Sequence, residues 1–370
     1  MRYLYLVVLA LTSAPFSPTL AQKAEPAGAP ENIEILLNTD GELTLNGVPA
    51  TSKATTNKAQ NPANDRLVRQ SSSGRETKVF TTKTEARASK RHEKLGIDIP
   101  DRSLVSLRTQ KGDVTISGVN AYLSGHMQSG ALALNDLKGE VELVSEQGDI
   151  TATGVEARGM LIARQGSIRL TDVTGLIATH APQGKISLLI GANYYKKSPK
   201  PLDIELPAGE IEITSAPYGG KVQLGKGSLS VTDIGQPLTI RAETASIAIR
   251  GLAAPLSLRN RGNVAVQLAR FADRKDESQT VDIETSNGDV TLELAKNFAG
   301  SLEIWITETN PAGGEAPILS KVALGKATVG DNGWGDGTVN IRETTNSVVI
   351  GKGGPKVSVH VTNGKVIINN

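Results

Sequence analysis

Two aspartates in equivalent sequence contexts are the residues most suggestive of acid–base chemistry. Asp113 and Asp149 each follow a glycine and lie 36 residues apart. If the chain coils every 18 residues, two coils would separate these carboxylates by about 9.6 Å, near the range used by inverting glycosidases. However, Ala131 occupies the equivalent place between them, and aspartate is common in turns because its carboxylate binds nearby backbone amides. We therefore expect these aspartates to be structural.

The histidines are spaced too widely to share a metal ion. His126 and His180 lie 54 residues apart, which three coils would convert to about 14 Å, whereas metal–ligand bonds are about 2 Å long. The chain has no cysteine, which excludes thiolate catalysis, disulfides and cysteine zinc sites. It also has no P-loop, dinucleotide fingerprint, GxSxG, HExxH or GGxGxD calcium repeat. We predict no catalytic residue, no cofactor and no metal site.

Aromatic residues beside lysines are the best candidates for ligand binding. Tyr194 and Tyr195 precede Lys196 and Lys197, and Trp334 lies among glycines. Such rings could stack on sugars while the lysines hold an anionic polymer. The alternatives are that the tyrosines form a lid packed over one flank and that Trp334 anchors a turn. We expect Trp305 to pack inward.

An 18-residue repeat determines the elements that would position these residues. Its marker is a glycine that recurs at a fixed spacing, and insertions after residues 184 and 262 interrupt this spacing. The marker positions are Gly112, Gly130, Gly148, Gly166, Gly184, Gly209, Gly227, Ala245, Gly262, Gly288, Asn346 and Gly364. Aliphatic residues occupy the second and fourth positions after most of these markers, with polar or small residues between them. This alternation is typical of a strand with one buried face. A second strand precedes each marker.

We predict an all-β fold, a right-handed β-solenoid with about 18 residues per turn over residues 101–370. A flat antiparallel meander would fit the alternation but would leave a large apolar face uncovered. A left-handed hexapeptide helix needs an apolar residue every six positions, and Asp113 stands six residues after Leu107. Coiling instead stacks each strand on its copy about 4.8 Å away.

The N-terminal hundred residues differ from the repeat. Arg2, an apolar run and Thr19-Leu20-Ala21 predict a signal peptide over residues 1–21, and the lack of cysteine excludes a lipoprotein. Residues 22–50 predict a short β-hairpin-like segment that turns at Asp40-Gly41. Residues 51–100 read as a basic polar linker that we expect to be disordered; residues 51–94 hold 11 Lys or Arg and four Asp or Glu, a net charge of +7. This linker could contact an anionic membrane or polymer.

The phrases Lys111-Gly112-Asp113-Val114-Thr115-Ile116 and Ser286-Asn287-Gly288-Asp289-Val290-Thr291-Leu292 resemble one bacterial family. It is the putative-adhesin β-strand-repeat domain of unknown function, found in exported envelope proteins. The resemblance covers roughly residues 104–368. It implies a β-solenoid outside the cytoplasm and supplies no catalytic motif.

We therefore expect an exported, non-enzymatic protein of the periplasm or cell surface, acting as an adhesin-like or scaffold module. The expected partner is a cell-wall or surface glycan, or another envelope protein, and nucleic acid is not expected because few aromatics interleave with the basic residues. One alternative is a polysaccharide lyase or hydrolase. Another is a self-assembling structural protein, because the last strand, residues 365–368, would present unpaired backbone. The oligomeric state stays open.

Overall fold

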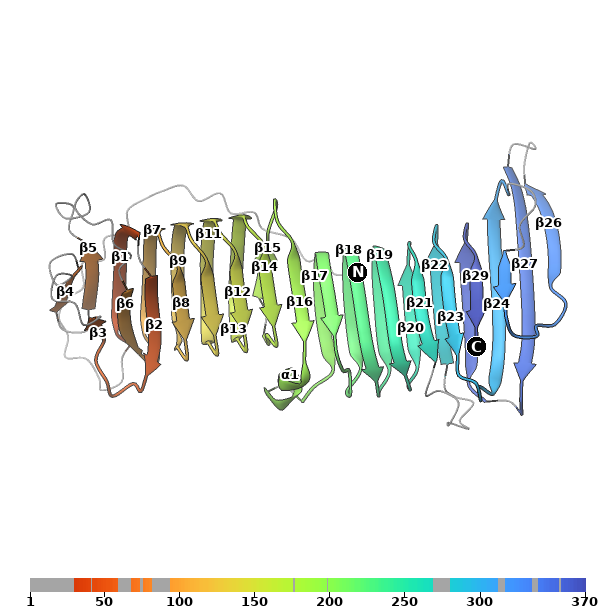
Figure 1. Ribbon diagram of the computed structural model, residues 1–370, viewed down its shortest axis with the longest axis horizontal. Coiled ribbons are helices and arrows are strands. Elements are labelled where there is room, and N and C mark those ends of the chain that lie inside the picture. Colours follow the sequence, from red (N-terminus) through yellow and green to blue (C-terminus); the bar gives the residue numbers. More distant parts are fainter. Residues whose placement is uncertain are drawn as a thin grey trace.

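The computed structural model describes residues 30–370 apart from 41, 59–67, 74–75, 82–93, 176, 198, 269–279, 312–316, 335–338 and 353. The protein is an elongated row of β-strands lying side by side along its longest axis, with one short helix at the side (Figure 1). The all-β prediction is confirmed. Within the part of the chain that the structure describes, no helix is long and apolar enough to cross a membrane. The predicted signal peptide, residues 1–21, lies outside the described residues.

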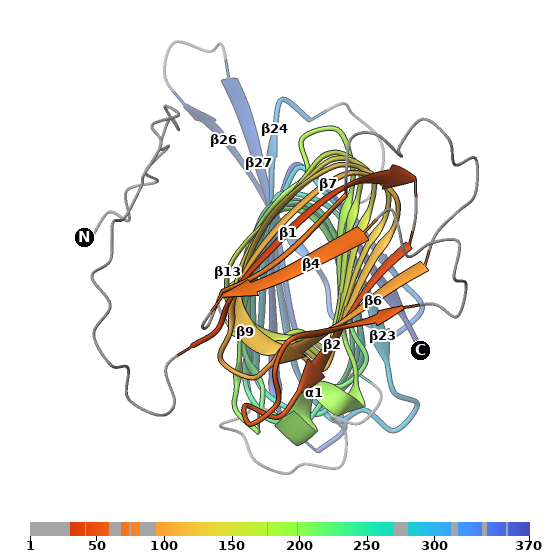
Figure 2. The same ribbon diagram turned by 90° about the vertical axis from the view of Figure 1, so that its left-hand side faces the viewer.

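Each coil contributes one strand to a long face and the next strand to a short face. In the N-terminal half the long face contains β7 (Leu104–Lys111), β9 (Asn120–Ser129), β11 (Lys138–Gln147), β13 (Glu156–Gln165) and β15 (Ile177–His180). The short face contains β8 (Val114–Ser117), β10 (Leu132–Asn135), β12 (Ile150–Thr153), β14 (Ile168–Thr171) and β16 (Ile186–Ile190). Neighbouring strands are parallel, and Leu132 lies opposite both Val114 and Ile150, each 18 residues away. Seen from the N-terminal end, the coils superpose on one another (Figure 2).

Alternation along each strand builds the core between the two faces. In β8, Val114 and Ile116 are buried while Thr115 and Ser117 are half-buried. The same pattern in β10 and β12 places like residues above one another. Aliphatic side chains therefore form ladders along the axis, and their burial is the main favourable contribution to folding.

In the C-terminal half, three long strands span both faces. They are β17 (Leu202–Ile213), β18 (Gly220–Ile234) and β19 (Leu238–Leu252). The next coils are again split, into β20 (Leu256–Asn260) with β21 (Val264–Leu268) and β22 (Thr280–Ser286) with β23 (Val290–Leu294).

The order of coils in space departs from the order in sequence at the C-terminal end. The last coil, β28 (Lys356–Thr362) and β29 (Val366–Asn369), lies between the β22–β23 coil and the coil of β24 (Gly300–Thr309) and β25 (Ile318–Ser320). The prediction of an unpaired last strand is wrong, because β29 pairs with β23 on one side and β25 on the other. Beyond β24, β27 (Val339–Ile350) pairs antiparallel with it, and β26 (Thr328–Trp334) pairs antiparallel with β27. Asn346, one of the predicted markers of the repeat, lies within β27.

The N-terminal end has a similar construction. β1 (Asn32–Asp40) lies in the long face between β7 and β5 (Glu76–Thr81), and β2 (Glu42–Val48) lies in the short face between β8 and β6 (Lys94–Pro100). β1 and β2 are thus two strands of one coil, so the predicted hairpin over residues 22–50 is wrong. The chain then forms a coil on the outer side of this one, and β4 (Val68–Ser73) and β3 (Thr55–Lys58) flank it antiparallel to β5 and β6.

These strands also correct the predicted disordered linker over residues 51–100. Val79, Ile97 and Ile99 are fully buried, because the first coil offers them an apolar surface that the sequence of the segment alone does not reveal. Lys78 pairs with Glu34 of β1 and with Glu76, each at 3.2 Å. The hydrogen bond to Glu34 is the main reason that the pKa of Lys78 is raised. Part of the basic polar linker, residues 59–67 and 82–93, lies outside the described residues.

The two halves meet at a discontinuity of the long face. β15 pairs with β13, and the first half of β17 pairs with β18, but among the described residues β15 and β17 do not pair with each other. Only the short face is continuous, where Leu188 of β16 lies opposite Ile211 of β17. Gly209 therefore lies over Ile186 rather than over Gly184, a shift of two residues from the predicted column. An even shift keeps the aliphatic residues facing inward.

Candidate functional site

The predicted tyrosines lie at this discontinuity and pack against the core. They belong to α1 (Ala192–Lys197), and both rings contact the C-terminal core cluster. The centroid of the Tyr195 ring lies 5.1 Å from that of Tyr194 and 5.7 Å from that of Tyr218. The Tyr195 hydroxyl is buried without a hydrogen-bond partner. Burial raises the pKa of both Tyr194 and Tyr195. This arrangement matches the alternative of a lid over the flank.

The other predicted binding residues are not brought together. The Lys196 ammonium donates to the Asn193 side-chain oxygen at 3.1 Å, and the side chain of Lys197 lies outside what the structure describes. The backbone of Trp334 lies opposite Val339 in the C-terminal hairpin, far along the axis from α1 (Figure 1); its side chain is likewise not described. The expectation for Trp305 is wrong: it is half-exposed between the buried Ile304 and Ile306, so it points outward.

The aspartates after the glycines link successive coils. The carboxylate of Asp113 accepts a hydrogen bond from the Ala131 amide, and that of Asp149 accepts one from the Ser167 amide, both at 2.8 Å. Asp289 binds the Lys365 amide in the same way at 2.9 Å. These bonds give Asp113 and Asp149 the structural role expected of them, and Asp289 has the same role. His126 and His180 lie three strands apart on the long face, as their spacing predicts, and the described residues contain no cluster that could hold a metal ion.

A different set of residues forms a continuous line across the outer surface of the long face. Strand pairing places one residue of each successive strand in register, and these residues, which we name the axial row, are Glu205, Gln223, Arg241, Arg259, Glu284, His360 and Trp305. Each of them lies between two buried neighbours on its own strand, apart from Arg241, which lies between the buried Ile240 and the half-buried Ala242, so all point away from the core. With strands about 4.8 Å apart, the row extends for about 29 Å along the axis.

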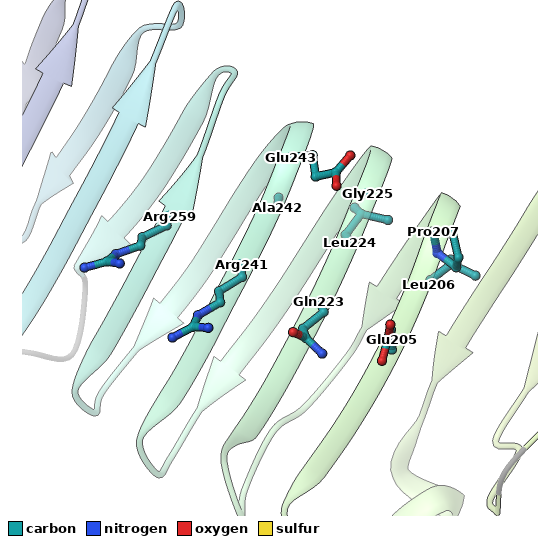
Figure 3. A pocket seen from close by; sticks show the side chains of 10 residues that line it. All are labelled: Glu205, Leu206, Pro207, Gln223, Leu224, Gly225, Arg241, Ala242, Glu243 and Arg259. Carbon is teal, nitrogen blue, oxygen red and sulfur yellow. The ribbon is translucent and has the colours of Figure 1, made fainter. Parts of the chain in front are cut away.

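A groove of about 500 Å³ follows the first four residues of the axial row. Its other walls are formed by the strand segments that follow them, including Pro207, Gly225 and Glu243 (Figure 3). The strands approach closely here, since a Cβ at Gly225 would lie 2.0 Å from the Pro207 carbonyl oxygen. Alternation also breaks, because Glu243 and Thr244 are both exposed. The groove thus lies where a side chain is missing, at Gly225, and where the alternation of inward and outward residues breaks.

The groove is lined by two arginines on adjacent strands and by two glutamates, Glu205 and Glu243. The Arg259 Nε lies 3.1 Å from a carboxylate oxygen of Glu284, which partly neutralises it. Arg241 lies in register between Gln223 and Arg259, neither of which is acidic. Among the described residues it makes no ion pair, and its side chain extends away from Glu243 in the direction taken by Arg259 (Figure 3). An exposed guanidinium in a groove can bind a carboxylate or phosphate in two parallel hydrogen bonds.

The far end of the axial row is aromatic. The rings of Trp305 and His360 are stacked, with centroids 4.4 Å apart and planes inclined by 11°. Beside them Lys356 and Glu303 form an ion pair at 2.8 Å. Because the two rings stack across neighbouring strands, one face of the indole is covered by the imidazole, and the stacked pair forms an aromatic patch beside polar groups.

Part of this row is visible in the sequence. Residues 205, 223, 241 and 259 recur every 18 positions, so the column of long polar side chains could have been read once outward positions were considered. The remaining members follow an insertion and the out-of-order final coil, so spacing alone does not place them.

Comparison with known proteins identifies the family. The model of the family described as Toastrack DUF4097 matches residues 29–310, more than half of the chain. The chain belongs to the Toastrack DUF4097 family. The Toastrack fold is β-solenoid-like. The membership of this chain in the family confirms the resemblance seen in the repeated glycine phrases. The match ends just after β24, so the antiparallel strands β26 and β27 and the last coil, β28 and β29, lie outside the matched residues.

Other comparisons add little. No curated protein matches this Toastrack chain. One solved structure, that of a protein described as a "putative cell adhesion protein" from Clostridium sporogenes ATCC 15579, is 11% identical and aligns over 94% of this chain and 95% of that one, with a TM-score of 0.16. A likeness at that TM-score indicates neither a shared fold nor a shared function.

Proposed function

We propose that this Toastrack protein is a non-enzymatic, adhesin-like binding module of the cell envelope, built on a right-handed β-solenoid with about 18 residues per turn, that holds an extended surface or cell-wall glycan along its long face. The observation that supports it is the axial row, seven outward side chains in register along the axis. A linear polymer can contact such a row repeatedly, because successive strands present a new side chain about every 4.8 Å. The glycan is therefore favoured over a compact envelope protein as the partner.

The location follows from the predicted export signal. Residues 1–21 would direct the chain out of the cytoplasm, where the axial row could meet wall or surface polymers. Mass spectrometry of the protein from a cell envelope fraction should give a mature N-terminus at Gln22. Recovery of the uncleaved chain from the cytoplasm would contradict this part of the proposal.

Binding rather than catalysis fits the acids of the groove. Glu205 and Glu243 are the carboxylates that line it, and both are exposed. A glycosidase acid usually needs an apolar surrounding that keeps its proton near neutral pH. Exposed carboxylates instead accept hydrogen bonds from sugar hydroxyls.

The test is affinity electrophoresis of the mature protein in gels that contain purified polysaccharides, acidic and neutral. We expect retardation by at least one glycan and no shortening of that polymer after prolonged incubation with the protein. Absence of retardation by every glycan would contradict the proposal, and shortening of the polymer would show an enzyme instead.

A further inference from the structure

We propose that the groove between Glu205 and Arg259 is a carboxylate-binding subsite for an acidic polysaccharide, with Arg241 as its principal ligand. This inference rests on the proposed function and adds the chemical class of the glycan and the residue that selects it. The groove has a volume of about 500 Å³ and lies open on the outer surface of four adjacent strands.

The charges along the row single out Arg241. Arg259 has Glu284 at 3.1 Å, and its charge is directed to that neighbour. Arg241 has Gln223 on one side and Arg259 on the other, so the pair of arginines carries one positive charge more than the acid that contacts it. A ligand carboxylate placed between the two guanidinium groups would receive charge-assisted hydrogen bonds.

The remaining walls of the groove suit the hydroxyls of a sugar. Glu205 precedes Gln223 in the axial row, and Glu243 lies at the opposite edge (Figure 3). Carboxylates accept hydrogen bonds from hydroxyls, and an amide both donates and accepts. A sugar acid thus finds a cation for its carboxylate and acceptors for its hydroxyl groups within one groove.

The same acids disfavour a phosphodiester polymer. Such a chain has fewer hydroxyl donors per charge than a polymer of sugar acids, so it would lie against Glu205, Glu243 and Glu284 with less compensation. A polysaccharide with carboxylates tolerates these neighbours because its hydroxyls bind them. Along the axis, the same chain could reach the stacked Trp305 and His360, about 14 Å beyond Arg259.

The experiment measures affinity of the mature protein for polygalacturonate by isothermal titration calorimetry. Arg241→Gln should weaken binding at least tenfold. Arg241→Lys keeps the positive charge but lacks the planar guanidinium, so its affinity should lie between those of Arg241→Gln and the unmodified protein. The matched control is Arg250→Gln, since Arg250 is an exposed arginine of the same strand, β19, beyond the corner on the short-face side. Arg250→Gln should bind polygalacturonate with the same affinity as the unmodified protein.

Two further polymers separate the sources of binding. Methyl-esterified polygalacturonate, which lacks the charge, should bind the unmodified protein weakly and should not discriminate between it and Arg241→Gln. Equal affinity of Arg241→Gln and unmodified protein for polygalacturonate would overturn the subsite while leaving the proposed function intact. Stronger binding of poly(glycerol phosphate) than of polygalacturonate would overturn the assignment to carboxylates. All three variants alter an exposed side chain, and matching circular dichroism spectra and melting temperatures would show that they fold.

Discussion

The corners between the faces show how a missing side chain sets the distance between coils. Gly148 has a φ of 149°, and a Cβ there would lie 1.9 Å from the Gly130 carbonyl oxygen. Gly118 also has a positive φ, 65°, but a Cβ there would meet nothing within 4 Å. The first glycine is needed for close approach and the second only for its backbone conformation.

We predict different costs for alanine at these two positions. Gly148→Ala should lower the free energy of unfolding by about 3 kcal/mol or more, because backbone must move to admit the methyl group. Gly118→Ala should cost about 1 kcal/mol, the penalty of a left-handed conformation. Urea denaturation followed by circular dichroism measures both. Equal costs would mean that the coils are not packed corner over corner.

Tyr195 gives a second prediction at the scale of one residue. Its hydroxyl is buried without a partner, so Tyr195→Phe should raise the free energy of unfolding by up to about 1 kcal/mol. Because burial raises the pKa of this phenol, the neutral form is favoured in the folded state. Its contribution is fully present below the unfolded pKa of about 10 and is lost as pH rises above that value.

Thermal melting between pH 8 and pH 11 tests this alkaline effect. The unmodified protein should lose stability above about pH 10, and Tyr195→Phe should lose less. Tyr218→Phe serves as the matched control, because Tyr218 is exposed and its substitution leaves both buried phenols of α1 in place. Parallel curves for the unmodified protein and Tyr195→Phe would show that Tyr195 is solvated.

The junction between the halves is the weakest part of the molecule at the scale of elements. Four residues of β16, Ser187–Ile190, pair with β17, whereas β18 and β19 pair along nearly their whole lengths. The core likewise separates here into two clusters that share the half-buried Ile186 and Leu188. The helix α1 lies at this junction, and its Tyr194 and Tyr195 pack against the C-terminal core cluster.

Hydrogen exchange should reveal the discontinuity. Amides of β15 and of residues 202–206 have a neighbouring strand on one side, so we expect them to exchange faster than amides of β11 and of residues 226–231 of β18, which have a strand on both sides. Mass spectrometry of exchanged peptides measures this difference. Uniform protection across β11, β15 and β17 would contradict the break in the long face.

The 18-residue repeat allowed the strands of the central coils and their inward residues to be predicted, as at Val114, Ile116 and Ile150. Position in space could not be predicted where chain order and coil order differ, because alternating aliphatics look alike in β23, β25 and β29. Val79 and Ile97 were missed because few apolar residues suffice when an existing coil covers them. The groove was missed because outward residues carry no core pattern, although residues 205, 223, 241 and 259 share one spacing.

At the scale of the whole molecule, antiparallel strands flank both faces at the N-terminal end and the long face at the C-terminal end. β3 and β4 flank the first spatial coil, and β26 and β27 flank the last. Strands of opposite direction at each end interrupt the parallel pairing that would extend the solenoid into a second molecule. This construction favours a monomer over end-to-end assembly.

Removing one cap should therefore cause association. Replacing residues 322–352 by a short Gly-Ser linker deletes β26 and β27 and exposes the edge of β24. Light scattering at increasing concentration should show a constant mass for the unmodified protein and a rising mass for the variant. Fibres of the unmodified protein would contradict the role of the caps.

A crystal structure of the protein with a galacturonate oligosaccharide tests the central claim, that the axial row holds an acidic glycan, most directly. We predict a sugar chain parallel to the long axis with one carboxylate within hydrogen-bonding distance of the Arg241 guanidinium. A chain bound at α1 or on the short face, or one lying along a single strand instead of across several, would contradict it.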